Sequence, residues 1–111
     1  MRFVWLIQSL GKRKMPVLKC HKPTFYSQLD EEMFFTSLTK IAGVSKIEGR
    51  GWDLFFSVRA QPSEKALREM LGLFFRYKVD MRQLAQFLTR KNRAWFGSSD
   101  AYWFKKVFPA R

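Results

Sequence analysis

The chain contains only one cysteine and one histidine, and this scarcity limits the chemistry that it can perform. Cys20 has no partner for an internal disulfide, so packing must stabilise the fold, and we expect a protein of the reducing cytoplasm. Cys20 and His21 are neighbours, and neighbours on a strand point to opposite faces. They therefore cannot act together as nucleophile and base. Two such residues also supply too few ligands for a transition-metal site.

Catalytic and nucleotide-binding motifs are missing as well. The sequence has no Walker-type loop, no Gly-x-Ser-x-Gly elbow and no Gly-x-Gly-x-x-Gly turn. The consecutive acids Asp30, Glu31 and Glu32 are explained by the positive end of a helix dipole rather than by a bound metal. We therefore expect a protein that is not an enzyme and needs no cofactor or metal.

Long apolar runs are also absent. No stretch approaches the roughly 20 apolar residues that span a bilayer, so we expect no stable membrane insertion. The apolar run over residues 3–7 is too short for the core of a signal peptide, and the basic residues 12–14 follow it. We interpret residues 1–14 as a basic N-terminal extension, with membrane-surface binding as another hypothesis, and residues 15–111 as a single α+β domain.

Apolar and aromatic side chains are abundant, at 47% and 17% of the 111 residues. That content is enough to offset the loss of chain entropy, so we predict a folded chain in spite of its net charge of +12. The charge is concentrated at the two ends. Residues 1–29 carry six Lys or Arg and no acid. Residues 30–75 carry six basic and seven acidic residues, and residues 76–111 carry nine basic and two acidic residues. This pattern predicts a nearly neutral core that presents a cationic surface to an anionic partner.

Periodicity predicts a strand followed by a helix in the first half of the chain. The strand lies over residues 16–23, where prolines bracket an alternating segment. The helix begins at Ser27 and ends in a left-handed cap at Gly43. Its expected apolar stripe consists of Phe34, Phe35, Leu38, Ile41 and Ala42.

A hairpin is predicted around residues 49–51, where glycine permits a positive φ. The residues of its second strand that are expected to face the core are Trp52, Leu54, Phe56 and Val58. This alternation leaves Phe55 on the opposite face. If the hairpin lies at an edge, Phe55 and Arg59 mark a surface for a partner protein or a second subunit.

Two more helices and an aromatic segment complete the prediction. One helix begins within residues 61–64, and its expected stripe is Leu67, Met70, Leu71, Phe74 and Phe75. Asp80 and Gln83 form a variant capping box for the next helix, with the stripe Met81, Leu84, Ala85 and Leu88. The period of residues 94–108 is ambiguous between helix and strand.

The order β-α-β-β-α-α describes a small α+β fold, in which helices pack on one face of a three-stranded sheet and an aromatic C-terminal segment follows. Over residues 16–78 this order resembles the front part of a ferredoxin-like sandwich, with helices in place of the fourth strand. The resemblance implies a topology and no functional residues, because that fold supports many unrelated activities.

Basic and aromatic residues alternate near the C-terminus. Cations attract phosphate, and exposed aromatic rings stack on unpaired bases, so we predict non-specific binding of nucleic acid. The cations predicted to contact it are Arg82, Arg90, Lys91, Arg93, Lys105 and Lys106. Trp95 and Trp103 either close the core or belong, with Phe55 and Arg59, to a surface for a protein partner.

The alternative function is that of a protein-interaction module. Such a module is a regulatory or immunity-type subunit that docks on an acidic protein, or a homodimer that self-associates through the hairpin. Charge alone cannot separate this hypothesis from nucleic-acid binding. A helix-turn-helix is a further hypothesis, because residues 84–88 resemble the first helix of such a unit. It is disfavoured by Thr89 in the turn and by Gly97 in the second helix.

Overall fold

The central strand of the sheet comes from the hairpin. In the computed structural model, which describes residues 15–110, the strands are β1 (Val17–His21), β2 (Ser45–Arg50) and β3 (Asp53–Ser57). Their spatial order is β1-β3-β2, and both pairs are antiparallel. Such an order arises when one hairpin strand inserts between two strands that a crossover helix connects, as in a split β-α-β unit. The predicted α+β class and three-stranded sheet are confirmed.

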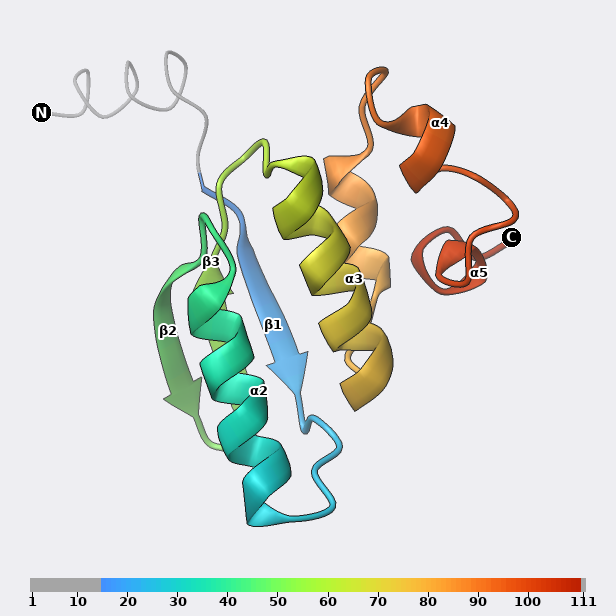
Figure 1. Ribbon diagram of the computed structural model, residues 1–111. Coiled ribbons are helices and arrows are strands. Elements are labelled where there is room, and N and C mark those ends of the chain that lie inside the picture. The colour runs from blue at the N-terminus through green and yellow to red at the C-terminus, as the bar shows by residue number, and fades with distance from the viewer. Residues whose placement is uncertain (1–14, 111) are drawn as a thin grey trace, which may run out of the picture.

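Two long helices, α2 (Gln28–Lys40) and α3 (Glu64–Tyr77), cover one face of this sheet (Figure 1). Helix α2 begins after the predicted Ser27, and α3 begins within the predicted residues 61–64. The hydroxyl groups of Ser27 and Ser63 cap the two helices by accepting backbone N–H groups three residues later. Three short elements follow and lie beside α3: the 3-10 helix η1 (Arg82–Phe87), α4 (Arg93–Phe96) and α5 (Phe104–Val107). The ambiguous segment 94–108 is therefore mainly helical turns. The proposed extension, residues 1–14, lies outside the described residues.

The core lies between the sheet and these helices. Along β1, Leu18 and Cys20 are buried while the residues between and around them are exposed, which confirms the predicted alternation. Phe56 of β3 meets Phe74 of α3 edge to face, with 6.1 Å between the ring centroids. Burial of such rings at roughly 25 cal/mol per Å² is the main source of stability in a chain without disulfides.

The two helical Phe-Phe pairs are split between core and solvent, contrary to the prediction that both members are buried. Phe34 and Phe74 are fully buried, whereas 36% of Phe35 and 42% of Phe75 are exposed. Consecutive residues on a helix differ by about 100°, so a pair at the border of the buried sector has one member inside it and one outside it. On α3 the buried sector extends to Leu73, on the flank opposite Phe75.

Two turn predictions are also wrong in detail. Helix α2 ends at Lys40 with Ile41 as its cap, and Gly43, at φ 91°, shapes the turn that follows. In the hairpin, Arg50 pairs with Asp53, which leaves Gly51 and Trp52 as a two-residue turn. Trp52 is therefore 76% exposed at the tip instead of facing the core.

The third predicted helix is a 3-10 helix, because its apolar residues repeat every three positions. Met81, Leu84 and Phe87 are buried, whereas Ala85 and Leu88 of the expected stripe are only partly covered. A 3-10 helix has three residues per turn, so this spacing puts all three side chains on one face. The predicted capping box is absent, because Asp80 accepts the Arg82 N–H while Gln83 reaches out to the sheet.

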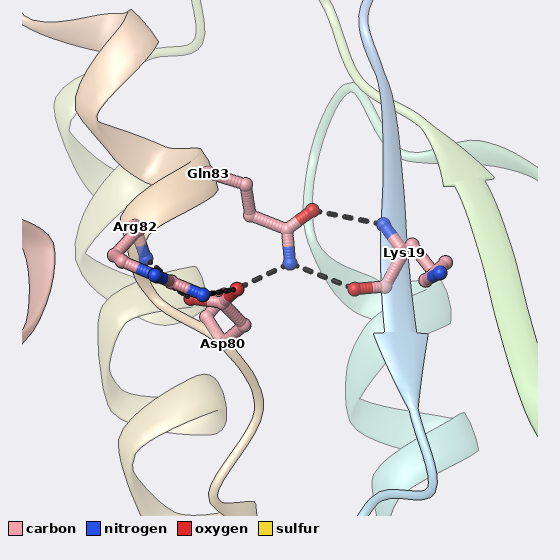
Figure 2. A network of polar contacts seen from close by, with 4 residues as sticks. All are labelled: Lys19, Asp80, Arg82 and Gln83. Carbon is pink, nitrogen blue, oxygen red and sulfur yellow. Dashed lines mark hydrogen bonds and ion pairs between the residues drawn. The ribbon is translucent and has the colours of Figure 1, made fainter.

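Gln83 occupies the free edge of β1 (Figure 2). Its Oε1 accepts the Lys19 N–H at 2.9 Å, and its Nε2 donates to the Lys19 carbonyl at 2.7 Å. The same Nε2 donates to the Asp80 carbonyl at 2.9 Å. One side-chain amide thus makes the pair of bonds that a residue of a neighbouring strand would make. This contact lies at the edge where the sheet has no further strand among the described residues.

The other edge strand, β2, is interrupted by a bulge. Ser45 pairs with Ser57 and Glu48 with Phe55, so two β2 residues lie opposite the single residue Phe56. Lys46, one of the two, adopts a positive φ of 53°.

We predict that Gln83→Ala lowers the free energy of unfolding by about 1–3 kcal/mol, because two hydrogen bonds to a strand backbone are lost. Urea denaturation measures this change, and hydrogen exchange at the Lys19 amide should accelerate. Gln86→Ala is the matched control on the same 3-10 helix, since Gln86 donates only to the Gln83 carbonyl. Equal losses of unfolding free energy in the two variants would show that the contact with β1 stabilises the fold no more than the Gln86 hydrogen bond does.

Candidate functional site

The one cysteine and the one histidine lie on opposite faces of β1. Burial raises the pKa of the Cys20 thiol to about 12, so the thiol is protonated at neutral pH. His21 is exposed on the outer face and pairs with Asp53 of β3. Within residues 15–110, no three His, Cys, Asp or Glu side chains converge as they would around a metal ion.

Four aromatic side chains form a continuous row beside α3. Trp95 of α4 meets Trp103 at 6.0 Å between ring centroids, Trp103 meets Tyr102 at 4.9 Å, and Tyr102 meets Phe75 of α3 at 4.9 Å. All three contacts are edge to face, which is the arrangement that aromatic quadrupoles favour. We call these four residues the aromatic row.

A cation lies at each end of the aromatic row. The Arg68 guanidinium lies 4.0 Å from the centroid of Trp95, and the Lys106 ammonium lies 5.9 Å from that of Phe75. Tyr102 lies between them. Desolvation raises the pKa of its phenol, while the positive charges of Arg76 and Arg68 act in the opposite direction. Arg68, Arg76 and Lys106 therefore lie near the row, and the charge of Arg68 is paired with Glu64 at 2.8 Å.

The members of the row differ in exposure. Trp103 is buried, and its Nε1–H donates to the Phe96 carbonyl at 2.8 Å, so the expectation that it belongs to a partner surface is wrong. Its indole is held in the core because this hydrogen bond satisfies its one polar group. Trp95 is half-buried, whereas 55% of Tyr102 and 42% of Phe75 are exposed. The last two rings are available to a ligand.

Two grooves lie at opposite ends of α3. The C-terminal groove, of about 600 Å³, follows the last turn of α3, and its polar and aromatic lining includes Phe75, Lys78, Asp80, Arg82, Lys105 and Lys106. The N-terminal groove, of about 700 Å³, adjoins the first turn, and its lining includes Gln61, Glu64, Gln86, Arg90, Lys91 and Trp95. Five of the six cations predicted to contact nucleic acid line one groove or the other, and Arg93 of α4 lines neither.

Arg82 is already paired within the protein. Its Nε and Nη2 bind the two carboxylate oxygens of Asp80 at 3.0 and 2.9 Å. The side-chain hydrogen bond from Arg82 lowers the pKa of Asp80, and the same pairing raises the pKa of Arg82. By contrast, Lys78, Lys105 and Lys106 form no ion pair with any residue in the described range 15–110. These three lysines supply the uncompensated charge of the C-terminal groove.

Phe55 and Arg59 lie apart from these grooves. Phe55 is half-buried on the outer face of β3, which is the central strand and not an edge, and the Arg50 guanidinium lies 5.0 Å from its ring. Arg59 follows the end of β3 and packs beside the turn at Gly43. The structure therefore does not unite these residues with Trp95 in one partner surface, because Trp95 contacts α3 on the other side of the sheet.

Sequence reasoning missed Phe75, Tyr102, Lys78 and Arg68. Phe75 was expected in the buried stripe because its spacing from Phe74 and Leu71 permits that position. The sequence signal that indicates exposure of Phe75 is Arg68, a charged residue seven positions earlier on the same flank of α3. Nothing in the sequence indicated that Tyr102 would contact Phe75.

Comparison of the chain with protein-family models, curated protein sequences and solved structures found no significant match. No helix within residues 15–110 is long and apolar enough to cross a bilayer.

The Asp80–Arg82 pair predicts a pH-dependent contribution to stability. Because the pKa of Asp80 is lowered in the folded state, the contribution is present at neutral pH and is lost as the pH falls through that lowered value. We expect Asp80→Asn to reduce the free energy of unfolding by less than about 1 kcal/mol at pH 7, since the pair is largely exposed.

Urea denaturation between pH 7 and pH 2 measures this effect. The difference between wild type and Asp80→Asn should disappear at the acid end. Asp100→Asn is the matched control, because Asp100 forms no ion pair among residues 15–110. A difference that stays constant across the pH range would contradict the assignment.

Proposed function

We propose that the protein binds nucleic acid non-specifically through the C-terminal groove and the exposed rings beside it. The observation that supports this proposal is the juxtaposition of three lysines that form no ion pair within residues 15–110 and two solvent-exposed, mutually contacting aromatic rings. Lysine ammonium groups bind phosphate as flexible point charges and carry no base specificity. Exposed rings offer a stacking surface for any unpaired base.

The acid in the groove does not oppose this function. Asp80 lines the groove, but its carboxylate is bound on both oxygens by Arg82. Phosphate entering the groove therefore meets a neutral pair and three cations rather than a free carboxylate. A cytoplasmic location, inferred from the single thiol, belongs to the same proposal.

Self-association through the hairpin is a second candidate function. It is favoured by Trp52, a large apolar side chain that is 76% exposed at the tip of the hairpin. Trp52 also lines a groove of about 690 Å³ together with Phe25, Phe35 and Leu54. A second copy that covers this ring would remove its apolar surface from water.

Nucleic-acid binding predicts that Lys105→Gln/Lys106→Gln weakens binding to mixed-sequence single-stranded DNA and reduces its salt dependence. The slope of log affinity against log salt should fall by about 1.4, since each lost phosphate contact removes about 0.7. Fluorescence anisotropy from low to physiological salt measures both quantities.

The matched control is Lys40→Gln/Lys46→Gln, which removes the same charge from exposed positions that line neither groove. If the two double variants lose affinity equally, binding depends on the net charge of the protein and not on the C-terminal groove. Wild-type affinity no greater than that of an unrelated protein of equal charge would refute the proposal and leave docking on an acidic protein as the better hypothesis.

Self-association predicts a dimer that Trp52→Ser dissociates, because the substitution removes the exposed ring. Sedimentation equilibrium at micromolar concentrations measures the association constant. Val17→Thr is the control, since Val17 is 62% exposed at the opposite end of the sheet. A wild-type protein that is monomeric throughout the concentration range excludes this second function.

A further inference from the structure

We propose that the two grooves and the aromatic row form one continuous track along α3, and that this track binds a single strand of nucleic acid. The inference rests on the proposed function, which concerns the C-terminal groove alone. It assigns the N-terminal groove to the same ligand and names unpaired nucleic acid as the ligand class.

The track follows one flank of α3. Arg68, Gly72 and Phe75 lie at positions i, i+4 and i+7, so their side chains share that flank. Each contacts the row in turn: Arg68 lies over Trp95, the Tyr102 hydroxyl lies above Gly72, and Phe75 meets Tyr102. The contacts of the row therefore follow α3 from one groove to the other, with Trp95, Tyr102 and Phe75 partly exposed and Trp103 buried behind them.

The distance between the grooves suits a short oligonucleotide. Arg68 and Lys78 are ten residues apart, and a helical rise of 1.5 Å per residue places them about 15 Å apart along the axis of α3. Compact single-strand-binding folds occupy about 4–16 nucleotides. A strand of that length can reach cations at both ends of α3 at once.

The N-terminal groove has the chemistry to hold the second end of the strand. Arg90 and Lys91 line it and form no ion pair with residues of the described range 15–110. Its one lining acid, Glu64, accepts the Arg68 Nε–H at 2.8 Å, so that charge is compensated. The groove at each end of the track thus presents free cations beside an acid that is already paired.

The order of these groups favours a single strand over a duplex. Cations lie at the two ends, and the exposed rings of Tyr102 and Phe75 lie between them. Bases in a duplex are stacked on one another, so they cannot stack on these rings, and only the phosphate contacts would remain. An unpaired strand can use the rings and both sets of cations together.

The test compares two oligothymidylates, one of two and one of twelve nucleotides, by fluorescence anisotropy at low salt. For Arg90→Gln/Lys91→Gln we expect at least a tenfold loss of affinity for the longer strand and less than a twofold loss for the shorter one. The reason is that only the longer strand reaches both grooves. Tyr102→Leu should weaken binding of both strands about tenfold, through loss of stacking. Thermal melts establish that each variant is folded, and Phe75→Leu replaces Tyr102→Leu if that variant is unstable.

The outcomes separate this inference from the proposed function. Suppose that Lys105→Gln/Lys106→Gln weakens binding but Arg90→Gln/Lys91→Gln has no length-dependent effect. The proposal of a continuous track is then wrong, whereas the proposal that the C-terminal groove binds nucleic acid is retained. Failure of the wild-type protein to bind either strand overturns both. Binding of a twelve-base-pair duplex as tight as that of the single strand contradicts the assignment to unpaired nucleic acid.

Discussion

The contact between Gln83 and the edge of β1 anchors the C-terminal third of the chain to the sheet. The amide is bound to both backbone groups of Lys19, which fixes η1 against the sheet. Helix α5 packs on η1 in turn, and Lys105 and Lys106 are carried on α5. Gln83 therefore helps to position these lysines beside the last turn of α3, together with the direct contacts that Tyr102 and Lys106 make with Phe75.

Helix α3 is packed on two sides, and this arrangement explains the aromatic content of the C-terminal segment. Its inner side, through Phe74, closes the core against Phe56 of the sheet. Its outer flank is covered by Trp95 and Tyr102, while Trp103 is sealed behind them by its hydrogen bond to Phe96. A three-stranded sheet with two helices has little interior of its own, so the C-terminal aromatics extend the core and leave two rings at its surface.

The sequence was sufficient to predict the features that local chemistry controls. Alternation located β1, Ser27 located the start of α2, and residues 61–64 contained the start of α3. Features that depend on tertiary contacts were missed. The helical spacing of Met81, Leu84, Ala85 and Leu88 suggested an α-helix, whereas the bond from Gln83 to β1 accompanies a 3-10 helix that buries Phe87 instead. Likewise, five cations of the grooves were predicted from the sequence, but Lys78, the division of the cations between the two ends of α3 and the pairing of Arg82 were not.

The two edges of the sheet are closed to further strand pairing by different means. At β1 the backbone groups of Lys19 are already satisfied by the Gln83 amide, and at β2 the bulge at Lys46 bends the ladder beside a series of charged side chains. Small sheets with free edges tend to polymerise edge to edge at the concentrations reached during synthesis. Both features reduce the unpaired strand edge from which edge-to-edge aggregation begins, in a chain that is rich in phenylalanine and has no internal disulfide to restrain partial unfolding.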